Sequence, residues 1–219
     1  ITDAKIMLKR RPKSLYKSYN EAVKHLQIGD IVFFHGKFGW KRAINRIIGR
    51  SYWTHVSIVF EIVKSGDEIL SVILIEANET VRLHRLETFA IQDYEFEIGF
   101  KRVPGLTPKE IDRFRGFFLD VIDIDYDYDH VAYLLFQFIL SRFIGVSWTK
   151  KLVRHVLTTD EYICSSFVQR ALYLAVEPQK RRETLFLGND VPYALAQGLV
   201  LPRDIAASKN TVWLYNPHD

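Results

Sequence analysis

The chain has 219 residues, of which 48% are hydrophobic and 26% charged, with a net charge of +4 and a pI near 9.0. This composition excludes an intrinsically disordered chain and is typical of a folded domain with its own core. The single cysteine, Cys164, excludes an internal disulfide and a cysteine-rich zinc site. We therefore expect a single domain over residues 1–219, with no metal and no organic cofactor.

The positive charge is concentrated in clusters, which are usually solvated faces and otherwise bind anionic membranes, wall polymers or nucleic acid. No motif of a nucleic-acid-binding module is visible, so we expect no nucleic acid partner. Contact with an anionic surface or membrane stays open. The clustered residues are Lys5, Lys9, Arg10, Arg11, Lys13 and Lys17, then Lys41, Arg42, Arg46 and Arg50, and finally Lys180, Arg181 and Arg182.

The first half of the chain predicts a helix followed by strands. Leu15, Tyr19, Ala22, Val23 and Leu26 have helical spacing, which predicts a helix over residues 14–26. A buried strand over 31–34, a helix with one basic side around 40–48, and a hairpin come next. The hairpin joins β-branched strands over 55–62 and 69–77 through the turn 64–67.

The second half predicts one more strand and then mostly helices. Residues 94–103 alternate as in a strand, and Thr107, Pro108 and Glu110 form a capping box that begins a helix. Helices around 131–143 and 164–174 follow, then an irregular tail from Glu177 with a last strand over 211–215. This pattern predicts an α+β fold, in which helices pack against a mostly antiparallel sheet.

The longest apolar stretch, Val131 to Trp148, is borderline in length for a membrane span. Because Arg142 would be costly at mid-bilayer, we interpret the stretch as a buried or interfacial helix. The chain begins at Ile1 rather than at Met, which suggests that a segment was removed or left out. No signal segment is visible in the sequence, and its cellular location is unknown.

Three residues have the chemistry of a thiol-dependent active site. Cys164 lies where a polar turn becomes a helix, and the unpaired N–H groups of a helix N-terminus favour a thiolate. His55 opens a strand, and Glu76 ends a neighbouring one, so the carboxylate can orient the imidazole as a base. The plainer alternatives are a small buried cysteine, a structural histidine and a carboxylate that faces water.

Other candidates are weaker. The aspartates at 123, 125, 127 and 129 lack the glycine and glutamate of an EF-hand loop. The remaining histidines show no paired metal-ligand spacing, although His155 is an alternative base. Asp30, Tyr52 and Trp53 lie near the motifs and are candidates for lining a substrate cleft.

Six motifs in one order resemble the circularly permuted NlpC-type, papain-like cysteine hydrolases of the YiiX/YebB kind, in which histidine precedes cysteine. The resemblance covers about residues 28–174, and it leaves a basic N-terminal helical extension and an irregular C-terminal extension outside. The motifs are Gly29–Phe34, Ile44–Gly49, Trp53–Val59, Ile75–Ala77, Tyr126–Tyr128 and Tyr162–Val168.

The resemblance implies a papain-like core with Cys164 as nucleophile, His55 as base and Glu76 as the residue that orients the histidine. It implies hydrolysis of an amide bond, as in a peptidoglycan-type peptide, through an acyl-enzyme. Two alternatives stay open: a lipid acyl thioesterase or acyltransferase on the same fold, and a binding module that has kept the scaffold without catalysis.

Overall fold

The computed structural model describes residues 13–36, 52–77, 81–91, 96–121, 164–184, 186 and 200–219. Its centre is one six-stranded sheet in the order β4-β3-β2-β1-β5-β6, and every neighbouring pair is antiparallel. The predicted α+β class is therefore confirmed. The strands are β1 (Ile31–Gly36), β2 (His55–Ser65), β3 (Glu68–Ala77), β4 (Val81–Arg85), β5 (Phe96–Arg102) and β6 (Val212–Tyr215).

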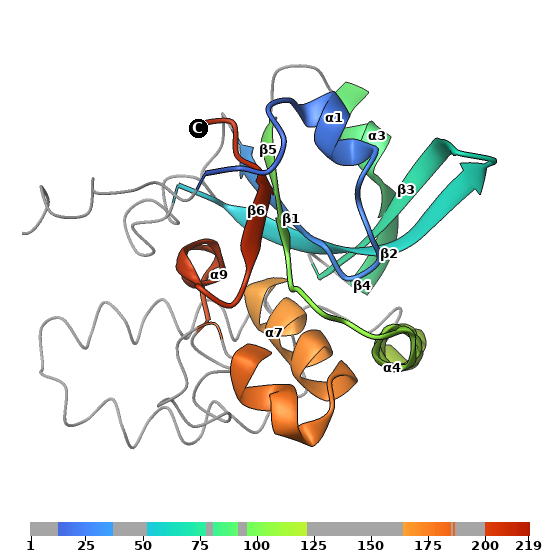
Figure 1. The fold of residues 1–219 in the computed structure, drawn as a ribbon, viewed down its shortest axis with the longest axis vertical. Helices are drawn as coiled ribbons and strands as arrows, with labels where there is room; N and C mark the ends of the chain where they lie inside the picture. Colours follow the sequence, from blue (N-terminus) through green and yellow to red (C-terminus); the bar gives the residue numbers. More distant parts are fainter. Residues whose placement is uncertain are drawn as a thin grey trace, which may run out of the picture.

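Helices cover both faces of the sheet (Figure 1). On one face, α1 (Tyr19–Val23) and α3 (Leu86–Ile91) cover a core that includes Val32, Phe34, Val59, Leu74 and Phe100. On the other face lie α4 (Pro108–Val121), α7 (Cys164–Ala175), the 3-10 helix η3 (Pro178–Thr184) and α9 (Pro202–Ala207). Successive strand residues alternate between the two cores, so β2 presents different side chains to each.

The predicted β2–β3 hairpin is present, and its strands are longer than the sequence indicated. The turn is short because Gly66, at φ +60, adopts the left-handed conformation that lets the chain reverse at Gly66 and Asp67. Pairing runs from Ser65↔Glu68 back to Ile58↔Ile75. The first residues of β2 and the last of β3 lie beyond this ladder, where their side chains approach each other.

The predicted capping box begins α4. Thr107 and Glu110 exchange hydrogen bonds between side chain and backbone in both directions, at 3.3 Å and 2.8 Å. Glu110 also accepts from the backbone N–H of Glu177 and pairs with Lys180 at 3.2 Å. The cap of α4 thus ties this helix to the segment that follows α7.

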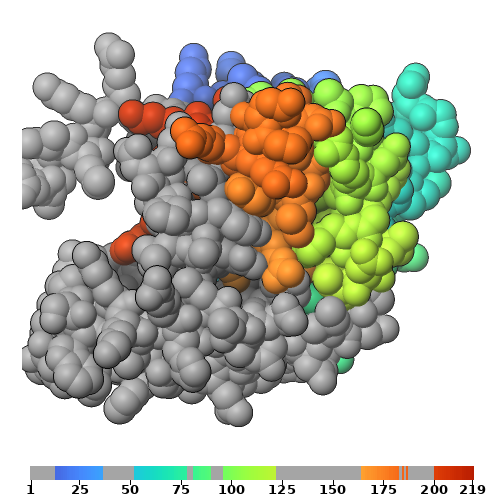
Figure 2. Space-filling model, turned by 90° about the horizontal axis from the view of Figure 1, so that it is seen from below, coloured from blue at the N-terminus to red at the C-terminus, as the bar shows by residue number. Residues whose placement is uncertain are grey.

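Helices α4 and α7 pack against each other on the lower face of the sheet, as Figure 2 shows from below. The ring of Phe118 lies 5.2 Å from that of Phe167, and both side chains are completely buried. The buried face of α7 packs on the sheet through the core that contains Val56 and Ile58. The cysteine at the start of α7 is thereby held near the start of β2.

Three regions differ from the sequence-based expectation. Only residues 19–23 of the expected 14–26 helix are helical, because Leu15 and Tyr16 instead donate backbone hydrogen bonds to β6. Strand β4 and helix α3 were not predicted. The tail, which was expected to be irregular, contains α9. The Lys101 ammonium donates hydrogen bonds to the carbonyls of Ile205 and Ala206 in α9 and of Ser208 just after it. Burial lowers the pKa of Lys101 to about 7.

Two glycines provide a matched test of this packing. A Cβ added at Gly99 in β5 would lie 2.8 Å from the Trp53 ring, whereas one added at Gly116 in α4 would meet nothing within 4 Å. We expect Gly99→Ala to lower the free energy of unfolding by about 1–3 kcal/mol. Gly116→Ala is expected to raise it by about 0.5–1 kcal/mol because alanine favours the helix. Urea unfolding measures both, and equal effects would contradict the packing described.

Candidate active site

Cys164 is the first residue of α7 and is 8% exposed. Polar contacts fix the helix along its length: Ser165 Oγ donates to the carbonyl of Val200. Gln169 donates to the carbonyl of Thr184 and accepts from the backbone N–H of Phe186. These bonds satisfy buried polar groups and join α7 to the segments that contain Thr184, Phe186 and Val200.

His55 is the first residue of β2 and is half-buried. Its ring is hydrogen-bonded to the thiol of Cys164, and its Nε2 lies 2.8 Å from Oε2 of Glu76. An ionised carboxylate only accepts hydrogen bonds, so Nε2 carries the proton that is donated to Glu76. Nδ1 is then the ring nitrogen left for the sulfur.

Glu76 lies next to the last residue of β3, and its side chain is 4% exposed. The sequence predicted that this carboxylate lies beside His55 on the neighbouring strand, and the structure brings the two together. The three candidate residues therefore form one chain of contacts, from Cys164 through His55 to Glu76.

The local electrostatics favour a thiolate at Cys164. Burial raises the pKa of the thiol, while the charge and hydrogen bond of His55 lower it. The backbone N–H groups of Val56 and Ser165 also stabilise the anion. The net result is a Cys164 pKa below its ordinary value.

The same contacts favour a protonated imidazole. Burial lowers the pKa of His55, while the charges of Cys164 and Glu76 and their hydrogen bonds raise it, to about 10 overall. Because the thiol pKa is lowered and the imidazole pKa is raised, these contacts favour the thiolate–imidazolium form of the pair. A nucleophile and the acid needed by a leaving group are then present together.

The three residues that were predicted to line a cleft, Asp30, Tyr52 and Trp53, differ in their location and exposure. Asp30 lies at the far end of β1 from the pair Phe34↔His55, and its carboxylate forms two hydrogen bonds with Arg102. Trp53 is 5% exposed and packs between other aromatic rings of the core. Tyr52, which is 39% exposed, is the one of the three that presents a substantial surface.

Two contributors were not predicted from sequence. His84, in β4, places Nε2 3.5 Å from Oε1 of Glu76, and Val56 contributes a backbone N–H at the sulfur. A backbone donor leaves no signal in the sequence. His84 was considered only as a metal ligand, and its short strand was not predicted.

Several predicted features lie outside the described residues. These are the helix around residues 40–48, the apolar stretch from Val131 to Trp148, the aspartates at 123–129, the Tyr126–Tyr128 motif and His155. Within the described ranges, no three His, Cys, Asp or Glu side chains are placed to hold one metal ion. No described helix combines the length and hydropathy of a membrane span.

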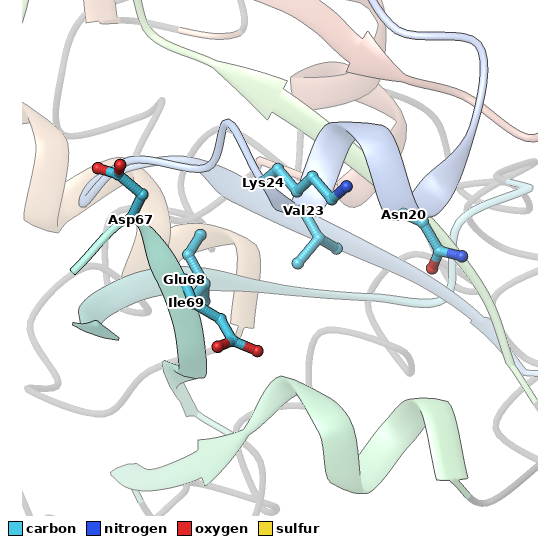
Figure 3. Close-up of a pocket in the computed structure, with 6 residues that line it drawn as sticks. All are labelled: Asn20, Val23, Lys24, Asp67, Glu68 and Ile69. Atoms are coloured by element: carbon cyan, nitrogen blue, oxygen red, sulfur yellow. The ribbon is translucent and has the colours of Figure 1, made fainter. Parts of the chain in front are cut away.

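A separate pocket of about 700 Å³ lies between α1 and the turn of the β2–β3 hairpin (Figure 3). Because β2 runs from His55 to this turn, the pocket is at the opposite end of the strand from the thiol. It is distinct from the candidate active site. Its lining residues are Asn20, Val23, Lys24, Asp67, Glu68 and Ile69.

Comparison with known proteins identifies the fold. No protein-family model and no curated protein sequence matches the chain. Among solved structures, the chain shares its α+β fold with a bacterial metalloprotein. That protein is YiiX of Escherichia coli O157:H7 (DUF1105), with a TM-score of 0.54 and 15% identity. The match covers 87% of this chain and 97% of YiiX.

The ion pair predicts a defined pH dependence of stability. In its thiolate–imidazolium form, the folded pair holds one proton, on His55. Unfolded, it holds two protons below about pH 6.5, one from 6.5 to 9.0, and none above 9.0. Stability rises with pH wherever the unfolded chain binds more protons. The pair's contribution thus rises up to pH 6.5, stays level to 9.0, and is lost as pH rises through about 10 or falls through the lowered thiol pKa.

The measurement is the difference in unfolding free energy between the wild type and Cys164→Ala from pH 4 to 10. Each proton contributes a slope of at most about 1.4 kcal/mol per pH unit. A difference that is independent of pH below 6.5 would contradict the ion pair.

Proposed function

We propose that this protein is a thiol-dependent hydrolase that cleaves an amide bond by acyl transfer. The observation that carries the proposal is the chain of contacts from Cys164 through His55 to Glu76, with a thiol pKa lowered by the histidine. A cysteine that is only a small buried hydrophobe does not need a charged imidazole as its neighbour. Such an arrangement is typical of a nucleophile with its base and orienting residue.

In the proposed mechanism, the thiolate of Cys164 attacks the carbonyl carbon of the substrate and forms a carbon–sulfur bond. The negative charge moves to the carbonyl oxygen, where the backbone N–H of Cys164 is a suitable donor at the helix N-terminus. As the intermediate collapses, His55 gives its proton to the amine nitrogen and the carbon–nitrogen bond breaks. A thioester and a neutral imidazole remain.

The second half of the reaction reverses these roles. Neutral His55 takes a proton from water, and the resulting hydroxide attacks the thioester carbonyl. The carbon–sulfur bond breaks, the acid leaves, and the thiolate–imidazolium pair forms again. Glu76 accepts from Nε2 of His55 throughout, which keeps Nδ1 directed at the sulfur and stabilises the imidazolium.

The finer family assignment is part of this proposal. The sheet with a cysteine helix packed on it, and histidine before cysteine in the chain, fit a circularly permuted NlpC-type, papain-like enzyme. The substrate class that we infer is therefore a peptide or another amide, such as a peptidoglycan-type peptide. The structural neighbour YiiX is named a metalloprotein. In the described part of this chain, His55 and Glu76 are hydrogen-bonded to each other, and no three His, Cys, Asp or Glu side chains are placed to hold one metal ion. No step of the proposed mechanism uses a metal.

A lipid acyl thioesterase or acyltransferase is the second candidate function. Leu119 of α4 is 67% exposed and Leu174 of α7 is 37% exposed, on two helices that pack together. Exposed apolar side chains beside basic residues favour contact with an anionic lipid surface. A non-catalytic binding module is the alternative if no covalent adduct forms.

The first test is the rate of Cys164 alkylation by iodoacetamide as a function of pH. An ordinary thiol titrates near pH ~8.5, whereas one paired with histidine titrates at least a unit lower. We expect fast labelling at pH 6, and a fall of about tenfold or more in His55→Ala. Labelling that follows an ordinary thiol in both proteins would contradict the proposal and favour a binding module.

The second test compares amide and acyl ester substrates. We expect hydrolysis of peptide amides to exceed that of fatty-acyl esters, with no increase when anionic vesicles are added. Cys164→Ala is the control and is expected to lose both activities. If ester turnover were higher and increased with vesicles, the lipid function would replace the amidase function. The double variant Leu119→Ser/Leu174→Ser would then reduce the vesicle effect.

A further inference from the structure

The side chain of Lys101 is buried on the face of the sheet that carries α7 and α9. Lys101 lies in β5, opposite Ile31 of β1 and Trp213 of β6, and both of these neighbours belong to the core on that face. It is 1% exposed, whereas lysines are almost never fully buried unless their charge is paired. The partners of its ammonium group therefore indicate what the residue does.

Three backbone carbonyls surround the ammonium group. Its Nζ donates to the carbonyls of Ile205 at 3.1 Å, Ala206 at 2.8 Å and Ser208 at 3.0 Å. Below its pKa of about 7, Lys101 has three N–H donors, one for each carbonyl. The end of a helix favours a positive charge, and the Trp213 ring lies 5.0 Å from Nζ. Lys101 therefore fastens the C-terminal end of α9 to the sheet.

The segment that enters α9 contacts the start of the cysteine helix. Val200, two residues before α9, is buried in the same core as Cys164. Its carbonyl accepts a hydrogen bond from Oγ of Ser165, which is also completely buried. Ser165 directly follows the nucleophile, and its backbone N–H is one of two that stabilise the Cys164 thiolate. Helix α9 thus joins the lysine at one end to the first turn of α7 at the other.

The plainer role of Lys101 is to satisfy the last carbonyls of α9, which adds stability without affecting the thiol. We propose instead that Lys101 is a positioning residue for the nucleophile, and that it acts through α9 and Val200 on Ser165. By fixing the end of α9, it keeps the carbonyl of Val200 within reach of the Ser165 hydroxyl. This inference rests on the proposed function, because its effect is on the reactivity of the Cys164 thiolate.

Lys209 provides a matched control for the charge. It follows Ser208, one of the three carbonyl residues, and its side chain is exposed. Lys209→Met therefore removes the same positive charge from the same part of the chain and leaves the carbonyl bonds of Lys101 in place. Ser165→Ala tests the route from the other end, because it removes the hydroxyl that donates to Val200 and keeps the backbone N–H.

The test is the rate of Cys164 alkylation by iodoacetamide at pH 6, divided by the plateau rate at high pH. This ratio follows the thiolate fraction and removes differences in how exposed the sulfur is. We expect Lys101→Met and Ser165→Ala each to lower the ratio by about threefold to tenfold, as for the loss of one buried hydrogen bond. The double variant is expected to match the lower of the two single variants, because both changes break one route. Lys209→Met is expected to keep the wild-type ratio.

Urea unfolding of the same variants separates the two roles. Both roles predict that Lys101→Met lowers stability, so lower stability with a wild-type ratio would leave only the helix cap and overturn the inference. Additive falls in the double variant, an equal fall in Lys209→Met, or a wild-type ratio in Ser165→Ala would also overturn it. If Lys101→Met does not fold, Lys101→Gln, which keeps N–H donors on a shorter side chain, replaces it in the comparison.

Failure of the inference and failure of the proposed function give different results. If the wild type labels rapidly at pH 6 and His55→Ala does not, the proposed function stands, whatever the Lys101 variants show. Slow labelling of the wild type at pH 6 would instead reject the proposed function, and the positioning role of Lys101 with it.

Discussion

The position of the N-terminus of α7 against the start of β2 is the constraint on which the candidate site depends. The thiol, the imidazole and a backbone N–H meet at this contact, and each comes from a different peptide unit. Packing between α7 and the core around Val56 and Ile58 provides the energy that holds it. The cap of α4 and the bonds of Gln169 then restrict where the helix can lie.

Burial alone would raise the pKa of the Cys164 thiol and lower the pKa of the His55 imidazole. It disfavours the thiolate and it disfavours the imidazolium, so neither charge is stable here without the other. Glu76 adds a negative charge that favours the imidazolium. A buried site of this kind is strongly coupled, so changes at one member alter the protonation of the rest.

Much of the site could be predicted from the sequence because its residues break local patterns. A histidine at the start of an apolar strand, a carboxylate after four apolar residues and a lone cysteine before a helix are all unusual for a simple core. The α+β class, the hairpin and the capping box followed from equally local signals. Whether the papain-like permutation and the single-domain boundaries are correct stays a prediction.

The remaining features depend on contacts between distant segments, which periodicity does not reveal. Leu15 and Tyr16 fit a helical pattern, yet they pair with a strand formed by the last residues of the chain. Asp30 lay close to the motifs in sequence, but in the structure it forms an ion pair with Arg102 at the end of β1 that is distant from His55. His84 gave no signal because its strand is short and lies at an edge of the sheet.

The sheet order has a consequence for how the site forms during folding. His55, Glu76 and His84 belong to one consecutive meander, β2-β3-β4, whose contacts are local and therefore quick to form. Cys164 reaches this meander only after the intervening chain has closed a long loop. A folding intermediate with the meander formed and α7 undocked would contain the base but an ordinary thiol, so the nucleophile would become reactive only at the last step of assembly.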